Sequence, residues 1–120
     1  MLHNIPLTTA AAMTLRYRLN KEAIVAPVFQ NKNLLPLSET FDRAAIESLL
    51  AKPGCTALRI YYGMDAELKL HAVLVASDAS NRDILPAAET GSALPDDDDT
   101  IELSIRCPPT CPDPSPLNQP

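Results

Sequence analysis

Apolar residues recur at helical spacing in the first part of the chain. Within residues 8–20, one helical face carries Ala12, Leu15 and Leu19, and Thr8 or Thr9 can cap the N-terminus. Pro27 cannot continue a helix because it lacks a backbone N–H. The pattern therefore predicts a first α-helix that begins near residue 8 and ends before Pro27.

A second stretch with helical periodicity follows residue 38. Ser38 or Thr40 can cap its N-terminus, and Pro53 with Gly54 can end it, because proline cannot continue a helix and glycine can turn the chain. The apolar positions in between recur at intervals of three and four residues and are Phe41, Ala45, Ile46, Leu49 and Leu50. A second α-helix is predicted here.

The middle of the chain alternates between two kinds of residue, as β-strands do. Strands are predicted over residues 57–64 and 68–75, and residues 63–67 supply the turn of a hairpin. We expect one face of this hairpin to pack on the helices, with Leu58, Ile60, Tyr62, Met64, Leu68, Leu70, Ala72 and Leu74. The other face carries Arg59, Tyr61, Lys69 and His71.

The last third of the chain changes character twice. Residues 87–99 are small and polar and end in four aspartates, which predicts a loop or linker. Residues 100–106 alternate again, so a late strand is predicted, whose partner is either the hairpin or the sheet edge of another protein. Six of the last thirteen residues are proline, which predicts an extended, polyproline-type tail.

These elements predict an α+β fold. Two helices pack on an antiparallel β-hairpin or small sheet, because a two-stranded hairpin alone is only marginally stable. We expect a compact α+β domain over residues 1–86, an acidic loop or linker over 87–99, and a late strand with a proline-rich tail over 100–120. A length of 120 residues, of which 46% are hydrophobic, is enough for one domain with a modest core.

The charge distribution argues against nucleic-acid binding. Residues 1–77 contain eight Lys or Arg and six Asp or Glu, whereas residues 78–120 contain two and nine. An acidic C-terminal third repels phosphate, and only 4% of residues are aromatic, so stacking platforms for bases are scarce. No signal-like segment or membrane span is recognisable in the sequence, and we expect a cytoplasmic protein, in which cysteines stay reduced.

Cys107 and Cys111 enclose the short segment Pro108-Pro109-Thr110. A closed zinc site needs about four ligands, and only Cys55, His71 and His3 could complete it. A disulfide between Cys107 and Cys111 is a second interpretation. We favour a third, in which the cysteines are reduced and anchor the tail as small apolar side chains.

Other candidate residues have plain structural interpretations. Cys55 follows a Pro-Gly turn and precedes a strand, which favours a buried thiol over a nucleophile. His71 is interpreted as a strand residue on the face of Arg59 and Tyr61. The Asp78, Asn81 and Asp83 side chains are expected to cap a turn, because the segment lacks the glycine and closing glutamate of a calcium loop. No catalytic motif stands out.

Several short motifs occur together in the second half of the chain. They are Pro53-Gly54-Cys55, Leu58-Arg59-Ile60-Tyr61-Tyr62-Gly63, Ala76-Ser77-Asp78, Asp83-Ile84-Leu85 and Cys107-Pro108-Pro109-Thr110-Cys111. In this order they resemble a group of small bacterial proteins that share a G-C-x-x-x-R-I-Y-Y-G hairpin and a C-terminal C-P-P-x-C. The group has no established activity. The resemblance therefore implies only that hairpin and tail occur as one unit.

Three functions are open on the sequence. The favoured one is a non-enzymatic interaction or accessory protein, in which a sheet edge and the segment from Thr100 contact a protein partner or a second copy through Ile101, Leu103, Ile105, Cys107 and Cys111. The alternative is a thiol or metal-binding protein that uses Cys107 and Cys111 with Cys55 or a histidine. The third is an enzyme whose Arg59, Tyr61 and His71 bind and polarise an anion. No cofactor is expected, apart from zinc in the alternative.

Overall fold

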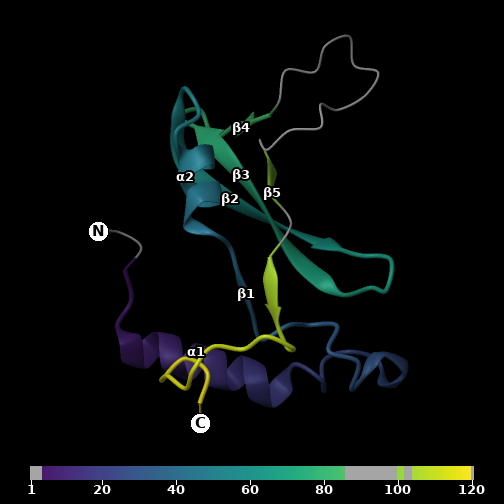
Figure 1. Cartoon of the computed structure of the whole chain (residues 1–120). Coiled ribbons are helices and arrows are strands. Elements are labelled where there is room, and N and C mark those ends of the chain that lie inside the picture. The colour runs from purple at the N-terminus through teal and green to yellow at the C-terminus, as the bar shows by residue number, and fades with distance from the viewer. Residues whose placement is uncertain (1–3, 86–99, 102–103, 120) are drawn as a thin grey trace. The chain divides into compact units, whose positions relative to one another are not determined.

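The computed structural model describes residues 4–85, 100–101 and 104–119 (Figure 1). The chain divides into two compact units, which are described separately below. Unit 1 comprises residues 1–38 and 106–120, and unit 2 comprises residues 39–105. The described residues contain α-helices and antiparallel β-strands, which confirms the predicted α+β class.

Unit 1 is built around helix α1 (Leu7–Asn20), followed by the short 3-10 helix η1 (Pro27–Phe29). The predicted first helix is confirmed, but it begins at Leu7 with Pro6 as its N-cap residue, so the predicted cap at Thr8 or Thr9 is wrong. The Tyr17 hydroxyl on α1 donates a hydrogen bond to the Pro36 carbonyl at 2.5 Å, and the Leu37 N–H donates to the Cys107 carbonyl at 2.8 Å. The segment after η1 is therefore held between α1 and the C-terminal segment.

The C-terminal segment of unit 1 turns back on itself. The Thr110 N–H donates to the Arg106 carbonyl at 3.0 Å, and Cys107 and Cys111 form a disulfide with their Cα atoms 4.7 Å apart. Further along, the Arg18 guanidinium on α1 donates to the carbonyls of Leu117 and Gln119 at 2.7 and 2.9 Å. The favoured interpretation of reduced cysteines in an extended tail is wrong, because the Thr110 hydrogen bond brings both cysteines within disulfide reach.

Unit 2 contains a long hairpin of strands β2 (Cys55–Met64) and β3 (Leu70–Asp78). They pair antiparallel, with Tyr61 opposite Val73 and Tyr62 opposite Ala72. On its other side, β3 pairs with β4 (Asp83–Ile84) and with β5 (Thr100–Ile101). The predicted hairpin is confirmed, and the first part of the predicted late strand pairs with this hairpin.

The hairpin turn lies two residues later than predicted. The Asp65 carboxylate accepts hydrogen bonds from the N–H groups of Glu67 and Lys69, at 2.8 and 3.0 Å. Leu68 adopts a left-handed conformation with φ of 68°. The turn therefore takes in Leu68 and Lys69, which the alternation alone had assigned to the second strand.

Helix α2 (Arg43–Leu50) packs on β2 and β3 (Figure 1). Its residue Leu49 is fully buried, as are Val75 and Ala76 on β3. The helix begins later than predicted, because Ser38–Thr40 is extended as strand β1, which pairs with β6 (Ile105–Cys107) in a separate two-stranded sheet. Asp42 is the N-cap residue.

The predicted domains 1–86, 87–99 and 100–120 stay a prediction, since residues 87–99 lie outside the described residues. The predicted late strand is present as β5 and β6, and the two residues that follow β5 also lie outside the described residues. In the described part of the chain, no helix combines the length and apolarity that crossing a membrane requires.

Candidate functional site

The backbone groups of the hairpin point alternately inward and outward. The Asp65 N–H donates to the Lys69 carbonyl at 3.0 Å, so this pair is hydrogen-bonded across the hairpin. Hydrogen-bonded and non-hydrogen-bonded pairs alternate along an antiparallel ladder. The register shows that the backbone N–H and C=O groups of the odd-numbered residues of β2, from Arg59 to Gly63, bond to β3. The backbone groups of the even-numbered residues of both strands point away from the partner strand, to the outer edges of the hairpin.

The outer edge of β3 is closed. The Asp78 N–H donates to the Arg82 carbonyl at 2.9 Å, Ala76 pairs with Ile84, and Leu74 pairs with Ile101. Where these partner strands end, the Ala72 N–H donates to Oε1 of Glu39 at 2.7 Å. A carboxylate thus continues the row of acceptors that the strands supply.

The outer edge of β2 is open among the described residues. Its outward groups belong to Leu58, Ile60, Tyr62 and Met64, and we call these backbone groups the outer β2 edge. The described part of the chain supplies no strand for this edge and no hydrogen bond to these backbone groups. Unpaired N–H and C=O groups along a strand edge are a template with which another strand can pair.

Three side chains on this edge are also exposed. Ile60, Tyr62 and Met64 are 51%, 76% and 63% exposed, whereas Leu58 is half-buried. The prediction that this whole face packs on the helices is therefore wrong at its far end. An eight-residue helix such as α2 is about 12 Å long and cannot cover a ten-residue strand of about 33 Å.

Arg59 and Tyr61 converge on one carboxylate on the opposite face of β2. The Arg59 guanidinium forms an ion pair with Oδ1 of Asp83, and the Tyr61 hydroxyl donates to Oδ2 at 2.6 Å. The Tyr61 hydrogen bond and the Arg59 charge lower the pKa of Asp83, outweighing the effect of desolvation. The same hydrogen bond raises the pKa of Tyr61. An external anion would have to displace Asp83 to reach these two donors.

His71 belongs to a separate cluster. Its Nδ1 lies 3.0 Å from Oε2 of Glu39, and its Nε2 lies 2.8 Å from Oδ2 of Asp65. The hydrogen bond with His71, together with the Lys69 N–H, lowers the pKa of Asp65. Arg59 lies opposite Val75, four residues from His71, which is a separation of about 13 Å along the strand. The predicted anion-binding residues are thus divided between two sites, each of which already holds carboxylates.

The cysteines and histidine do not assemble a metal site in the described residues. Cys107 and Cys111 are joined to each other in unit 1, and Cys55 in unit 2 donates its thiol to the Ala57 carbonyl at 3.3 Å. No group of three His, Cys, Asp or Glu side chains placed to hold a metal ion was found in the described part of the chain. His3 lies outside that part.

The residues predicted for interaction in the C-terminal segment differ in exposure. Ile105 on β6 is 49% exposed, whereas Cys107 is buried. The side chains of Ile101 and Leu103 lie outside the described residues, so their part in an interaction stays a prediction.

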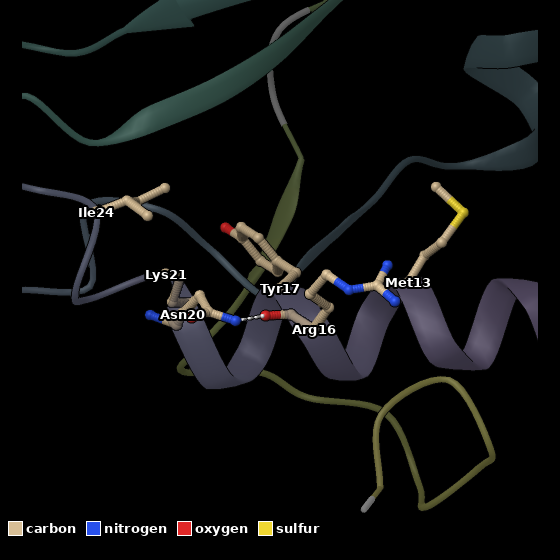
Figure 2. Close-up of a pocket in the computed structure, with 6 residues that line it drawn as sticks. All are labelled: Met13, Arg16, Tyr17, Asn20, Lys21 and Ile24. Carbon is tan, nitrogen blue, oxygen red and sulfur yellow. Dashed lines mark hydrogen bonds between the residues drawn. The ribbon is translucent and has the colours of Figure 1, made fainter.

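Unit 1 contains a separate open pocket of about 340 Å³ on α1 and the residues that follow it. Figure 2 shows its lining residues, which are Met13, Arg16, Tyr17, Asn20, Lys21 and Ile24. Three of its four polar side chains are already engaged: the Lys21 ammonium with Glu22 at 2.7 Å, the Asn20 amide with the Arg16 carbonyl at 2.8 Å, and the Tyr17 hydroxyl as above. We therefore assign no ligand to this pocket.

Comparisons with protein-family models, with curated proteins and with solved structures found no match. The site must therefore be judged on its own geometry. Three carboxylates bind the side chains of Arg59, Tyr61 and His71, and they belong to Glu39, Asp65 and Asp83. Sequence reasoning missed the first two and interpreted Asp83 as a turn cap. Of these, only Asp65 carried a local signal, since an aspartate in a hairpin turn commonly bonds to the backbone two residues later.

Proposed function

We propose that the protein is a non-enzymatic interaction or accessory protein, which binds a strand of a protein partner along the outer β2 edge. The observation that carries this proposal is the pairing difference within the hairpin: every outward backbone position of β3 from Ala72 to Asp78 has a partner, whereas the outer β2 edge has none among the described residues. Strand addition to such an edge is a common mode of peptide recognition.

The side chains of β2 support the same function. Natural edge strands are usually protected by lysine, proline, short length or a bulge. β2 has a bulge at its start, between Cys55 and Ala57, but residues 58–64 contain neither lysine nor proline. Their one charge, on Arg59, is on the opposite face and is paired with Asp83. An incoming strand therefore meets an uncharged, apolar edge.

The segment from Thr100 is a second proposed contact with the protein partner. Ile105 is exposed on β6, two residues before the buried Cys107. We propose that it adds apolar contact area, while the outer β2 edge supplies main-chain hydrogen bonds. Ile105→Lys tests this contribution separately from the edge.

The proposal is tested first by hydrogen exchange of the full chain at micromolar concentration. Tyr62 and Ala72 face each other across the hairpin, and both of their N–H groups point outward. We expect the Ala72 amide to be protected by Glu39 and the Tyr62 amide to exchange rapidly. Strong protection of Tyr62 in the dilute chain would mean that its edge is already occupied.

Binding is then compared between two variants. Tyr62→Lys places a charge on the open edge, whereas Leu19→Lys places one at a similarly exposed position in unit 1, at 72% against 76% exposure. Any protein or second copy that the immobilised chain retains should be lost with Tyr62→Lys and kept with Leu19→Lys. Equal retention by both variants would contradict an interaction through this edge.

A thiol function is the second candidate, and the disulfide favours it over metal binding. Cys107 is buried, whereas Cys111 is exposed, so a small thiol can reach one sulfur of the pair. The disulfide also conflicts with the predicted cytoplasmic location, where thiols are kept reduced. We expect one free thiol per chain, Cys55, before reduction and three afterwards. Three free thiols in freshly purified protein would remove this candidate and agree with a cytoplasmic location.

A further inference from the structure

We propose that the strand which pairs with the outer β2 edge is β2 of a second copy, in an antiparallel register centred on Tyr61. This inference rests on the proposed function and names its partner. Such a pair has two-fold symmetry, in which the same surface serves both copies. It would join the two hairpins into one continuous antiparallel sheet.

The direction of the backbone groups limits the registers. Only the even-numbered residues of β2 point outward, so each hydrogen-bonded pair must join an even residue to an even residue. With the centre at Tyr61, Leu58 lies opposite Met64 of the second copy, and Ile60 lies opposite Tyr62. All four residues of the outer β2 edge then pair, and the two-fold symmetry makes each pairing occur twice.

Neighbouring registers use the edge less well. With the centre at Ile60, Met64 has no partner among these four residues of the second copy, and with the centre at Tyr62, Leu58 has none. With the centre at Arg59, the two arginines lie directly opposite each other, and like charges in that position are destabilising. The register centred on Tyr61 instead places Arg59 opposite Gly63 of the second copy.

The side chains in this register are complementary. Ile60 opposite Tyr62 is a pair of a β-branched and an aromatic residue, a combination that stabilises antiparallel sheets. Both copies place their even-numbered side chains on the same side of the joined sheet. The exposed surfaces of Ile60, Tyr62 and Met64 from the two copies therefore merge into one apolar patch, which lowers their exposure to water.

Association is measured with the purified full chain alone, by sedimentation velocity over a series of concentrations. We expect a reversible monomer–dimer equilibrium. Tyr62→Lys should weaken dimerisation at least tenfold, the loss that corresponds to about 1.4 kcal/mol. Leu19→Lys is the matched control and should leave the equilibrium unchanged. A chain that stays monomeric at the highest concentration overturns the inference.

The register is tested by cysteine cross-linking in a Cys55→Ser background. The two Tyr61 residues form a non-hydrogen-bonded pair at the centre, where Cα atoms lie about 4.5 Å apart, within disulfide reach. Tyr61→Cys should therefore form a covalent dimer under mild oxidation. Met64→Cys should not, because six residues, or about 20 Å of strand, separate the two Met64 positions. Cross-linking of Met64→Cys would overturn this register.

A second design avoids the loss of the Tyr61 hydroxyl. Differently tagged Ile60→Cys and Tyr62→Cys chains are mixed, and we expect a mixed dimer, because these positions lie opposite each other at about 5.5 Å. Neither chain should cross-link as efficiently by itself. Failure of the mixed dimer alongside a wild-type dimer overturns the register.

The outcomes separate this inference from the proposed function. If the purified chain stays monomeric but retains another protein in a way that Tyr62→Lys abolishes, the second copy is the wrong partner and the interaction function stands. If the Tyr62 amide is already protected in the dilute monomer, the outer β2 edge is not available and both proposals fail. A concentration-dependent dimer that Tyr62→Lys dissociates supports both.

Discussion

The two outer edges of the hairpin differ in whether their backbone groups have hydrogen-bond partners. Along β3, the outward backbone groups are met by β4, by β5 and finally by the Glu39 carboxylate. Along β2, the corresponding groups of Leu58, Ile60, Tyr62 and Met64 have no such partner among the described residues. Both edges belong to strands of similar length, and they lie on either side of the same ladder.

An unpaired outer edge is therefore not a general property of this sheet. Glu39 is extended at the start of unit 2, and its carboxylate is 6% exposed, so the chain buries a charged group to close one edge. Burying a carboxylate is costly unless it is paired, and here His71 and the Ala72 N–H share it. The chain therefore closes one edge with a buried acidic side chain, whereas the other edge has no partner among the described residues.

The largest expected loss of stability distinguishes residues of β2 whose backbone N–H points toward β3 from residues whose N–H points to the outer edge. Tyr61→Pro removes an N–H that bonds to β3, together with the hydroxyl that bonds to Asp83, and should cause the largest loss of unfolding free energy among the variants considered. Tyr62→Pro removes an outward N–H, which no described residue accepts, and should cost much less. Urea denaturation of both variants measures the difference. Equal losses would mean that the assignment of odd and even residues is wrong.

The closed edge predicts an intermediate effect at Glu39. Glu39→Ala leaves the Ala72 N–H without its acceptor and His71 without one carboxylate, and should cost about 1.5–3 kcal/mol. Glu39→Gln keeps an oxygen that can accept from Ala72 and should cost less. Urea denaturation and exchange of the Ala72 amide provide the measurements. An unchanged exchange rate in Glu39→Ala would show that this carboxylate does not protect the edge.

The smallest effect concerns acid sensitivity. Because the pKa of Asp83 is lowered in the folded chain, its contribution to stability is present above the unfolded value of about 4 and is lost as the pH falls through the folded pKa. Asp83→Asn should lower the melting temperature at pH 7, and the gap from the wild type should narrow at pH 3. A gap that is constant with pH would show that the charge of Asp83 plays no part.

Local periodicity was enough to predict α1 and the hairpin, but not the short strands β1 and β4 or how the elements cover one another. Residues 8–20 and the hairpin were assigned from spacing alone, since both patterns depend on neighbours along the chain. The exposure of Ile60, Tyr62 and Met64 depends on the length of α2, and alternation carries no information about how far a covering element reaches. An apolar stripe on a strand is therefore equally consistent with a core and with an interface.

The candidate site was only partly predictable for a related reason. Arg59 and Tyr61 were placed on one face correctly, but their shared partner Asp83 is 24 and 22 residues further along the chain. It reaches them only because β4 pairs with β3. The disulfide was underrated because the expected compartment and the stiffness of proline both argued against it. Neither argument accounts for the hydrogen bond between Thr110 and Arg106 that closes the turn.

The hydrogen bond between the Leu37 N–H and the Cys107 carbonyl has a consequence for the architecture of the gene product. It places the point where the chain leaves unit 1 beside the point where the chain returns to it. In the sequence, unit 2 is thus a domain inserted into unit 1. Since loop-closure entropy grows only slowly with loop length, we expect inserts of different size between these two points to cost unit 1 little additional free energy. Exchanging unit 2 for another domain would leave both segments of unit 1, and the hydrogen bond between them, unchanged.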